Sequence, residues 1–265
     1  MPKISLFVLF MALFISSLNT GSNGNCFYIG NADEAILVDA GLTCKETEIR
    51  MQRLALSMYK VKAIFISHEH SDHIRGLPVL AKKYQIPVYI TPPTLLRGKQ
   101  LLQEHLVRSF AAYAPIQLGN LSITAFPKRH DAAEPHSFTI SCKGITVGVF
   151  TDIGSHCNHV IDNFKKCNAV FLEANYDDEM LERGSYPYFL KNRIRSGNGH
   201  LSNQQALDLF LAHKPSRMSH VFLSHLSKDN NCPDLVRNLF TQHANGTEII
   251  IASRLQETAV YHISV

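Results

Sequence analysis

The chain has 265 residues, of which 45% are hydrophobic and 18% are charged, a composition that excludes a disordered or fibrous protein. Its formal net charge of +4 is compatible with an anionic substrate but does not establish one. The six cysteines stand far apart without a C-x-x-C pair. This spacing argues against a disulfide framework or a cysteine-ligated zinc site and favours reduced thiols in a cytoplasmic protein.

The N-terminal segment allows two interpretations. Residues 4–16 are apolar and could form the core of a signal peptide, but they are too short to span a bilayer comfortably. Alternatively, residues 12–18 form a buried strand, which we favour because no clean A-x-A cleavage site follows them. We therefore expect a single domain over residues 11–265, preceded by an N-terminal extension, residues 1–10, that is either part of the protein or a signal segment.

Short apolar runs and helical spacings alternate along the rest of the chain, which indicates an α/β layered protein with two sheets covered by helices. Helices are expected at residues 46–56, 74–81, 203–212 and 233–243, the third opened by a capping box of Ser202 and Gln205. The expected strands lie at residues 26–29, 35–38, 61–66, 88–90, 121–126, 138–140, 146–150, 169–172, 221–223 and 248–251.

The strongest functional signal is the heptapeptide S-H-E-H-S-D-H at residues 67–73, directly after a predicted buried strand. In an extended loop, His68 and His70 project to the same side. Asp72 and His73 lie at the start of the next helix, from which they can face a second point. Imidazole and carboxylate ligands together suit zinc, manganese or iron. The loop therefore predicts a metal site.

This motif resembles the one found in the metallo-β-lactamase superfamily, whose four-layer αββα sandwich agrees with the elements expected above. Asp39 resembles the superfamily aspartate that supports the histidine loop through hydrogen bonds. The resemblance implies two divalent metal ions, Zn²⁺ or Mn²⁺. The implied ligands are His68, His70 and His130 for one metal, Asp72, His73 and His225 for the other, and Asp152 as a bridge between them.

Three other histidines compete with these assignments. His136 follows His130 by six residues, and we prefer His130 because the expected strand ends just before it. His156 and His159 lie close to Asp152, but we interpret them as ordinary loop histidines.

Two metals in such a site would lower the pKa of a bridging water, and the resulting hydroxide would attack a phosphoryl or carbonyl group.

Residues beyond the metal ligands favour a phosphodiester substrate. The segment P-K-R-H-D-A at 127–132 differs from the T-P-G-H-T-x-G of glyoxalase-type thioesterases. Glu173 and His200 resemble motifs of the tRNA 3′-processing endonucleases. That resemblance implies that Glu173 orients His200, which faces Asp72 and protonates the leaving oxygen. Alternatively, His200 merely helps to cap the helix that follows it.

Residues 173–203, with the turn at 21–25 and the segment 224–231, closely resemble the YycJ/WalJ-type branch of metal-dependent nuclease-like hydrolases. The turn could donate backbone N–H groups to a phosphate or be only a tight turn beneath the metals. Basic side chains expected around the mouth of the site would suit a polyanion, although each also fits an ordinary solvated charge. They are Arg75, Lys128, Arg129, Lys191, Arg193 and Arg195.

We therefore predict a cytoplasmic, dinuclear-metal phosphodiesterase or nuclease that acts on DNA or RNA and has no membrane partner. Hydrolysis of a small ester, lactam or thioester by the same fold is the first alternative. A metal-binding regulatory protein with little turnover is the second.

Overall fold

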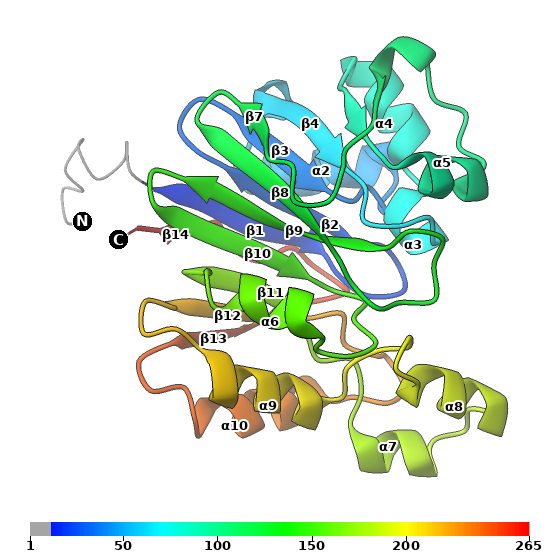
Figure 1. Cartoon of the computed structure of the whole chain (residues 1–265), viewed down its shortest axis with the longest axis vertical. Helices are drawn as coiled ribbons and strands as arrows, with labels where there is room; N and C mark the ends of the chain where they lie inside the picture. Colours follow the sequence, from blue (N-terminus) through cyan, green and yellow to red (C-terminus); the bar gives the residue numbers. More distant parts are fainter. Residues whose placement is uncertain (1–11, 265) are drawn as a thin grey trace.

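The computed structural model describes residues 12–264, and it contains two seven-stranded sheets packed face to face (Figure 1). The N-terminal extension, residues 1–10, lies outside the described residues. The first sheet has the order β14-β1-β2-β3-β4-β5-β6 and the second has the order β13-β12-β11-β10-β9-β8-β7. The strands of the first sheet are β1 (Leu13–Asn19), β2 (Cys26–Gly30), β3 (Ala35–Val38), β4 (Val61–Phe65), β5 (Val88–Tyr89), β6 (Val107–Arg108) and β14 (Tyr261–Ile263). Those of the second are β7 (Ile116–Leu118), β8 (Leu121–Pro127), β9 (His136–Cys142), β10 (Ile145–Phe150), β11 (Ala169–Glu173), β12 (His220–Ser224) and β13 (Glu248–Ile251).

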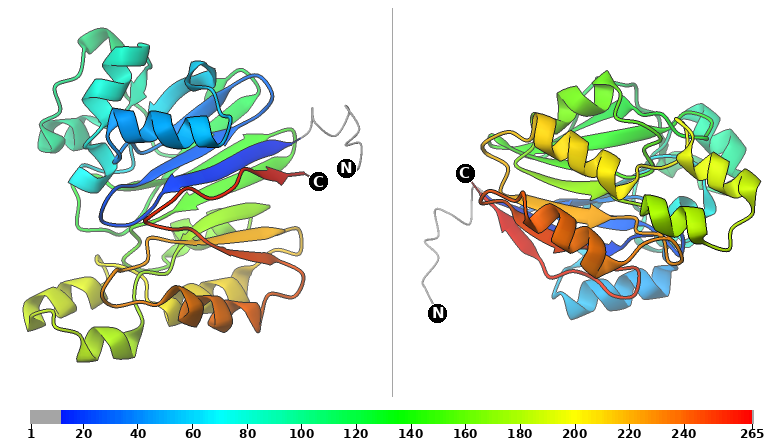
Figure 2. Two further views of the ribbon diagram at one scale, coloured as in Figure 1. Left: turned by 180° about the vertical axis from the view of Figure 1, so that it is seen from behind. Right: turned by 90° about the horizontal axis from the view of Figure 1, so that it is seen from below.

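Helices cover the outer face of each sheet, so the layers form an αββα sandwich (Figures 1 and 2). The helices packed on the first sheet are α2 (Cys44–Arg53) and α4 (Leu77–Tyr84), and those on the second are α6 (Asn158–Phe164), α9 (Asn203–His213) and α10 (Pro233–Thr241). The shorter helices are α3 (Ser71–Ile74), α5 (Pro92–Gly98), α7 (Asp178–Arg183) and α8 (Tyr188–Arg195). Within the described residues, no helix has the length and apolar character required to cross a membrane.

Three apolar cores hold the layers together, one between the sheets and one beneath the helices on each side. Strand β2 contributes to two of them, because successive side chains of a strand point to opposite faces. Phe27 and Ile29 pack between the sheets, whereas Cys26 and Tyr28 pack beneath the helices of the first sheet. Strands buried on both faces are continuous apolar runs in the sequence, which explains why the run lengths predicted them.

Each strand expected from the sequence is present, with ends displaced by at most two residues, and the capping box of Ser202 and Gln205 is confirmed. The expected helix over residues 74–81 is instead divided into α3 and α4 at Gly76. A Cβ atom at this glycine would lie 1.7 Å from the carbonyl oxygen of Leu42. The chain therefore bends there because only glycine permits this close approach. Strands β6, β7 and β14 and helices α5 to α8 were not anticipated.

Candidate metal centre

Most of the expected site residues lie at or just after the carboxyl ends of parallel strands, where side chains from neighbouring strands converge. The exceptions are His130, which follows the antiparallel strand β8, and His200, which lies in the loop before α9. Strand β4 leads into the heptapeptide loop, and β10, β11 and β12 are parallel neighbours. Asp39, Asp152 and His225 follow β3, β10 and β12 with φ angles of 63°, 55° and 58°. This left-handed conformation is uncommon for residues other than glycine and often occurs at functional sites.

The first expected ligand group comes together as three imidazoles. Nε2 of His68 lies 3.0 Å from Nδ1 of His70. The same Nδ1 lies 3.3 Å from Nε2 of His130. Three ring nitrogens directed at one another in this way can share a single cation.

The second expected ligand group forms next to the first. Oδ2 of Asp72 lies 3.5 Å from Nε2 of His73 and 3.7 Å from Nε2 of His225. Asp152 stands between the two groups, with one carboxylate oxygen 3.2 Å from Nε2 of His73 and the other 3.8 Å from Nε2 of His130. In each group the candidate ligand atoms all lie within 4.8 Å of one another.

Two buried atoms show that the cluster fits cations. Oδ2 of Asp152 and Nε2 of His225 are inaccessible to water and have no hydrogen-bond partner in the described part of the chain. Each such atom costs roughly 1–3 kcal/mol if it stays unsatisfied. A divalent ion at this point would satisfy both, and imidazole and carboxylate are suitable donors for zinc and manganese.

Several of the histidines are oriented by a hydrogen bond at Nδ1, the ring nitrogen that does not face the other candidate ligands. His73 directs Nδ1 at Oδ2 of Asp39, 2.7 Å away, and Asp39 also accepts the N–H and O–H of Ser67. Nδ1 of His130 lies 3.0 Å from the carbonyl oxygen of Gly199. Such outer partners select the tautomer and leave Nε2 free for a metal. The hydrogen bonds expected between Asp39 and the histidine loop are therefore present.

Glu173 is a fully buried acceptor at the end of β11. Its Oε1 lies 2.9 Å from Nδ1 of His200, as expected, and also 2.9 Å from Nδ1 of His225. Its carboxylate accepts the backbone N–H groups of Ile153 at 2.7 Å and Leu201 at 3.1 Å. The contact between Glu173 and His225 was not expected from the sequence. It arises because Glu173 pairs across β11 and β12 with Ser224, the residue before His225.

The electrostatics differ between the two ligand groups. Burial lowers the pKa of His68, and it lowers the pKa of His130 to about 4, which keeps both rings neutral and able to bind a metal. Burial alone would raise the pKa of Glu173, but the neighbouring His200 and His225 hold it at about 2. Burial likewise opposes protonation of His73, but Asp152 and Asp39 raise its pKa well above the usual value. The second group therefore favours positive charge.

The cluster opens into a cleft of about 360 Å³. His200 and Asp72 both line it, and the His200 side chain is 19% exposed. Nδ1 of His200 contacts Glu173 and lies 3.9 Å from Oδ1 of Asp152. The cleft is also lined by Tyr186 and by three residues of α8, namely Leu190, Arg193 and Ile194.

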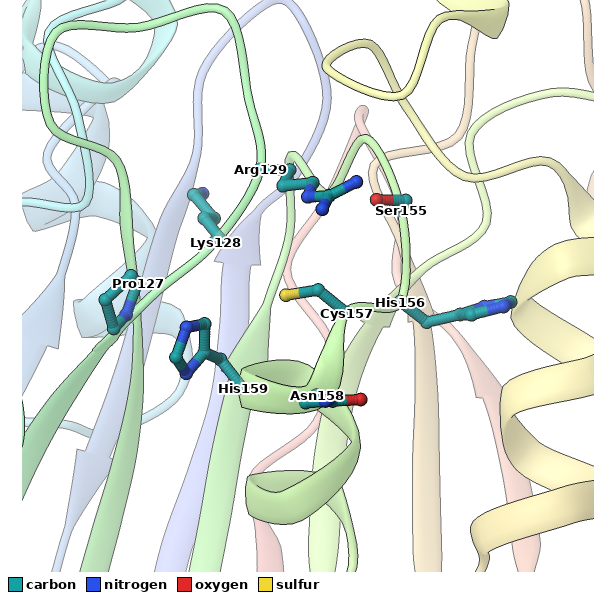
Figure 3. Close-up of a pocket in the computed structure, with 8 residues that line it drawn as sticks. All are labelled: Pro127, Lys128, Arg129, Ser155, His156, Cys157, Asn158 and His159. Atoms are coloured by element: carbon teal, nitrogen blue, oxygen red, sulfur yellow. The ribbon is translucent and has the colours of Figure 1, made fainter.

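The competing histidines lie elsewhere. His136 begins β9, and its ring packs against Phe110 with centroids 5.2 Å apart. His156 and His159 line a separate pocket of about 640 Å³ beside α6 (Figure 3), and His159 meets the hydroxyl of Tyr113. The structure thus brings together all seven expected ligands and leaves these three histidines outside the cluster.

The six basic residues expected around the mouth of the site lie in different surroundings. Among those six, Arg193 lines the cleft, where it donates to Asp131. Others hold the backbone or pair on the surface. Arg75 donates to the carbonyl oxygens of Asn23 and Gly41, and the buried Lys128 donates to the carbonyl oxygen of Thr151 at 2.7 Å. Lys191 and Arg195 both bind Glu182. Arg129 lines the pocket beside α6.

Two asparagines contribute to the site without having been anticipated. Nδ2 of Asn25 donates to Oδ2 of Asp72 at 3.1 Å, and Nδ2 of Asn175 donates to the carbonyl oxygen of His225 at 2.7 Å. Asn25 ends the turn 21–25, whose contacts favour the interpretation as a tight turn that supports the metal loop. Its position in a glycine- and asparagine-rich turn was the available signal.

Comparison with known proteins places the chain in a family. The model of the beta-lactamase superfamily domain matches residues 34–225. The exodeoxyribonuclease YycJ of Bacillus anthracis is 36% identical over 240 residues, which cover 88% of this chain and 89% of the relative. The exodeoxyribonuclease WalJ of Streptococcus pneumoniae is 33% identical over 228 residues, covering 83% and 84%.

Solved structures support the same fold. The metallo-beta-lactamase fold protein YhfI of Bacillus subtilis superimposes with a TM-score of 0.73 and 18% identity. The match covers 95% of this chain and 99% of that protein. The predicted four-layer αββα sandwich is therefore confirmed.

Proposed function

The chain belongs to the beta-lactamase superfamily and to its YycJ/WalJ-type branch, and on this basis we propose that it is a metal-dependent nuclease that hydrolyses phosphodiester bonds of DNA. One observation carries the proposal: two three-ligand groups meet at Asp152, beside a histidine held by Glu173. The identity to two exodeoxyribonucleases over most of the chain supports DNA as the substrate.

The proposed metal ligands are those expected from the sequence. His68, His70 and His130 would hold one divalent ion, and Asp72, His73 and His225 the other, with Asp152 between them. Zinc and manganese both suit these donors. When bound, such a pair of ions activates a water molecule as nucleophile and stabilises charge on the attacked phosphoryl group.

The chain itself supplies the proton for the leaving group. Glu173 accepts the hydrogen bond from Nδ1 of His200, so the ring is held with Nε2 available to the cleft. A deoxyribose alkoxide leaves poorly unless it is protonated, and a positioned acid contributes roughly 10²–10⁴ in rate. We therefore assign His200 as the general acid and Glu173 as the residue that positions it.

Labelled DNA and RNA oligonucleotides of one sequence test the proposal. The metal-depleted protein should be inactive, and added Mn²⁺ or Zn²⁺ should restore cleavage of DNA. Preferential cleavage of RNA would contradict the substrate assignment. Metal-loaded protein that cleaves nitrocefin but no phosphodiester would contradict the nuclease proposal itself.

A further inference from the structure

Two neighbouring aromatic side chains are exposed at the start of α8. Tyr188 is 79% exposed and Phe189 is 73% exposed. No residue of α8 is buried. Single exposed apolar residues are normal on protein surfaces. An adjacent aromatic pair on a helix that lines the metal cleft is instead a candidate binding surface.

The position of the pair follows from the other face of α8. Leu190, Arg193 and Ile194 line the metal cleft. Residues four apart on a helix are surface neighbours, so Phe189 lies one turn from Arg193, beside the cleft. Tyr188 continues the aromatic surface outward. Figure 1 shows α7 and α8 projecting from the sandwich as a pair of short helices.

Polar contacts hold this projection in place. Nε of Arg193 donates to Oδ2 of Asp131, the residue after a proposed metal ligand, at 2.5 Å. The hydroxyl of Tyr186 donates to Oδ2 of Asp229 at 3.0 Å, and Arg195 pairs with Glu182 of α7. The aromatic pair is therefore presented by an anchored helix beside the reaction centre.

We propose that Tyr188 and Phe189 form a platform on which unpaired bases of a DNA strand stack while its backbone enters the cleft past Arg193. The inference rests on the proposed nuclease function and deepens it by naming a single-stranded substrate segment. Every base has a π-face, so aromatic stacking binds single strands with little sequence preference. The remaining N–H groups of Arg193 can donate to a backbone phosphate. Bases within a duplex stack on one another and would not offer their faces to this pair.

Binding of a fluorescent single-stranded oligonucleotide to the full chain, measured by anisotropy, tests the platform. The double variant Tyr188→Ala/Phe189→Ala should bind roughly 5- to 150-fold more weakly for each base that loses its stacking partner. Its metal content should match that of the wild type. Tyr59→Ala is the matched control, because Tyr59 is 83% exposed outside α8, and it should leave binding unchanged.

An oligonucleotide with abasic positions separates stacking from other contacts. It should bind the wild type more weakly than the intact strand does, whereas the double variant should bind both strands alike. Equal affinity of wild type and double variant for the intact strand would overturn the proposal. So would a concentration-dependent dimer of the wild type that the double variant abolishes, because the pair would then be an interface between copies. The binding assay needs no turnover, so wild-type protein that binds the strand but hydrolyses no phosphodiester contradicts the proposed function and leaves the platform supported.

Discussion

Five of the seven proposed metal ligands are almost completely buried, whereas α8, which lines another part of the same cleft, has no buried side chain. These two parts of the cleft are called the ligand wall and the α8 wall below. The ligand wall is fixed by internal hydrogen bonds such as the one between His73 and Asp39. The α8 wall is held by surface contacts such as that of Arg193 with Asp131, and exposed ion pairs contribute little stability, about 0–1 kcal/mol each. The difference suggests that one wall performs the chemistry and the other selects and holds the substrate. Substitutions should therefore abolish the reaction on the first wall and weaken substrate binding on the second.

The largest effect is expected for Asp152→Asn, which preserves shape but removes the charge between the two ligand groups. We expect loss of bound metal and of DNA cleavage to the background level, measured by elemental analysis and an oligonucleotide assay. Asp162→Asn is the control, because Asp162 is exposed on α6. A variant of Asp152 that keeps two metal ions and full turnover would contradict the bridging role.

The next largest effect is expected for His200→Ala. Cleavage of DNA should fall by roughly 10²–10⁴ because the leaving alkoxide loses its acid. Hydrolysis of bis(p-nitrophenyl) phosphate should fall much less, since p-nitrophenolate leaves without a proton. Metal content should stay at the wild-type value. Equal losses on both substrates would show that His200 does not act as the acid.

Glu173→Gln should have an intermediate effect. The glutamine amide would turn an N–H₂ group toward backbone donors such as the N–H of Ile153. We expect a loss of roughly 10–100-fold in activity from misplaced histidines, and about 1–3 kcal/mol in the free energy of unfolding measured with urea. The exposed Glu179 provides the control Glu179→Gln. Unchanged stability and activity would exclude Glu173 as the residue that positions the two histidines.

The smallest effect is expected for Arg193→Gln on the α8 wall. The KM for single-stranded DNA should rise roughly 2- to 5-fold, as expected for the loss of an exposed ion pair and one phosphate contact. The dependence of log affinity on log salt should become shallower by about one. Arg183→Gln removes a comparable surface arginine and should change neither quantity. Abolished catalysis in Arg193→Gln would show that the two walls are not functionally distinct.

The ligand wall could be predicted from the sequence because its residues belong to short motifs after buried strands. Apolar run lengths predicted those strands, and the resemblance supplied His130, Asp152 and His225. The contact of Glu173 with His225 and that of Asn25 with Asp72 could not be predicted, because each depends on how distant segments pack.

The α8 wall could not be predicted from apolar spacing. The helix buries no side chain, and only Leu190 and Ile194, four residues apart, have the apolar spacing that would indicate it. The basic residues were misleading for a related reason. Charge alone does not distinguish Arg193, which lines the cleft, from Lys128, which is buried and hydrogen-bonded to the backbone.

We propose that seven side chains hold two metal ions at one point. Anomalous diffraction from crystals of the metal-loaded chain, recorded at the absorption edges of zinc and manganese, shows how many ions are bound and where each one lies. We expect two peaks per chain, one against His68, His70 and His130 and the other against Asp72, His73 and His225, with Asp152 contacting both. A single peak, or peaks away from these side chains, would contradict it.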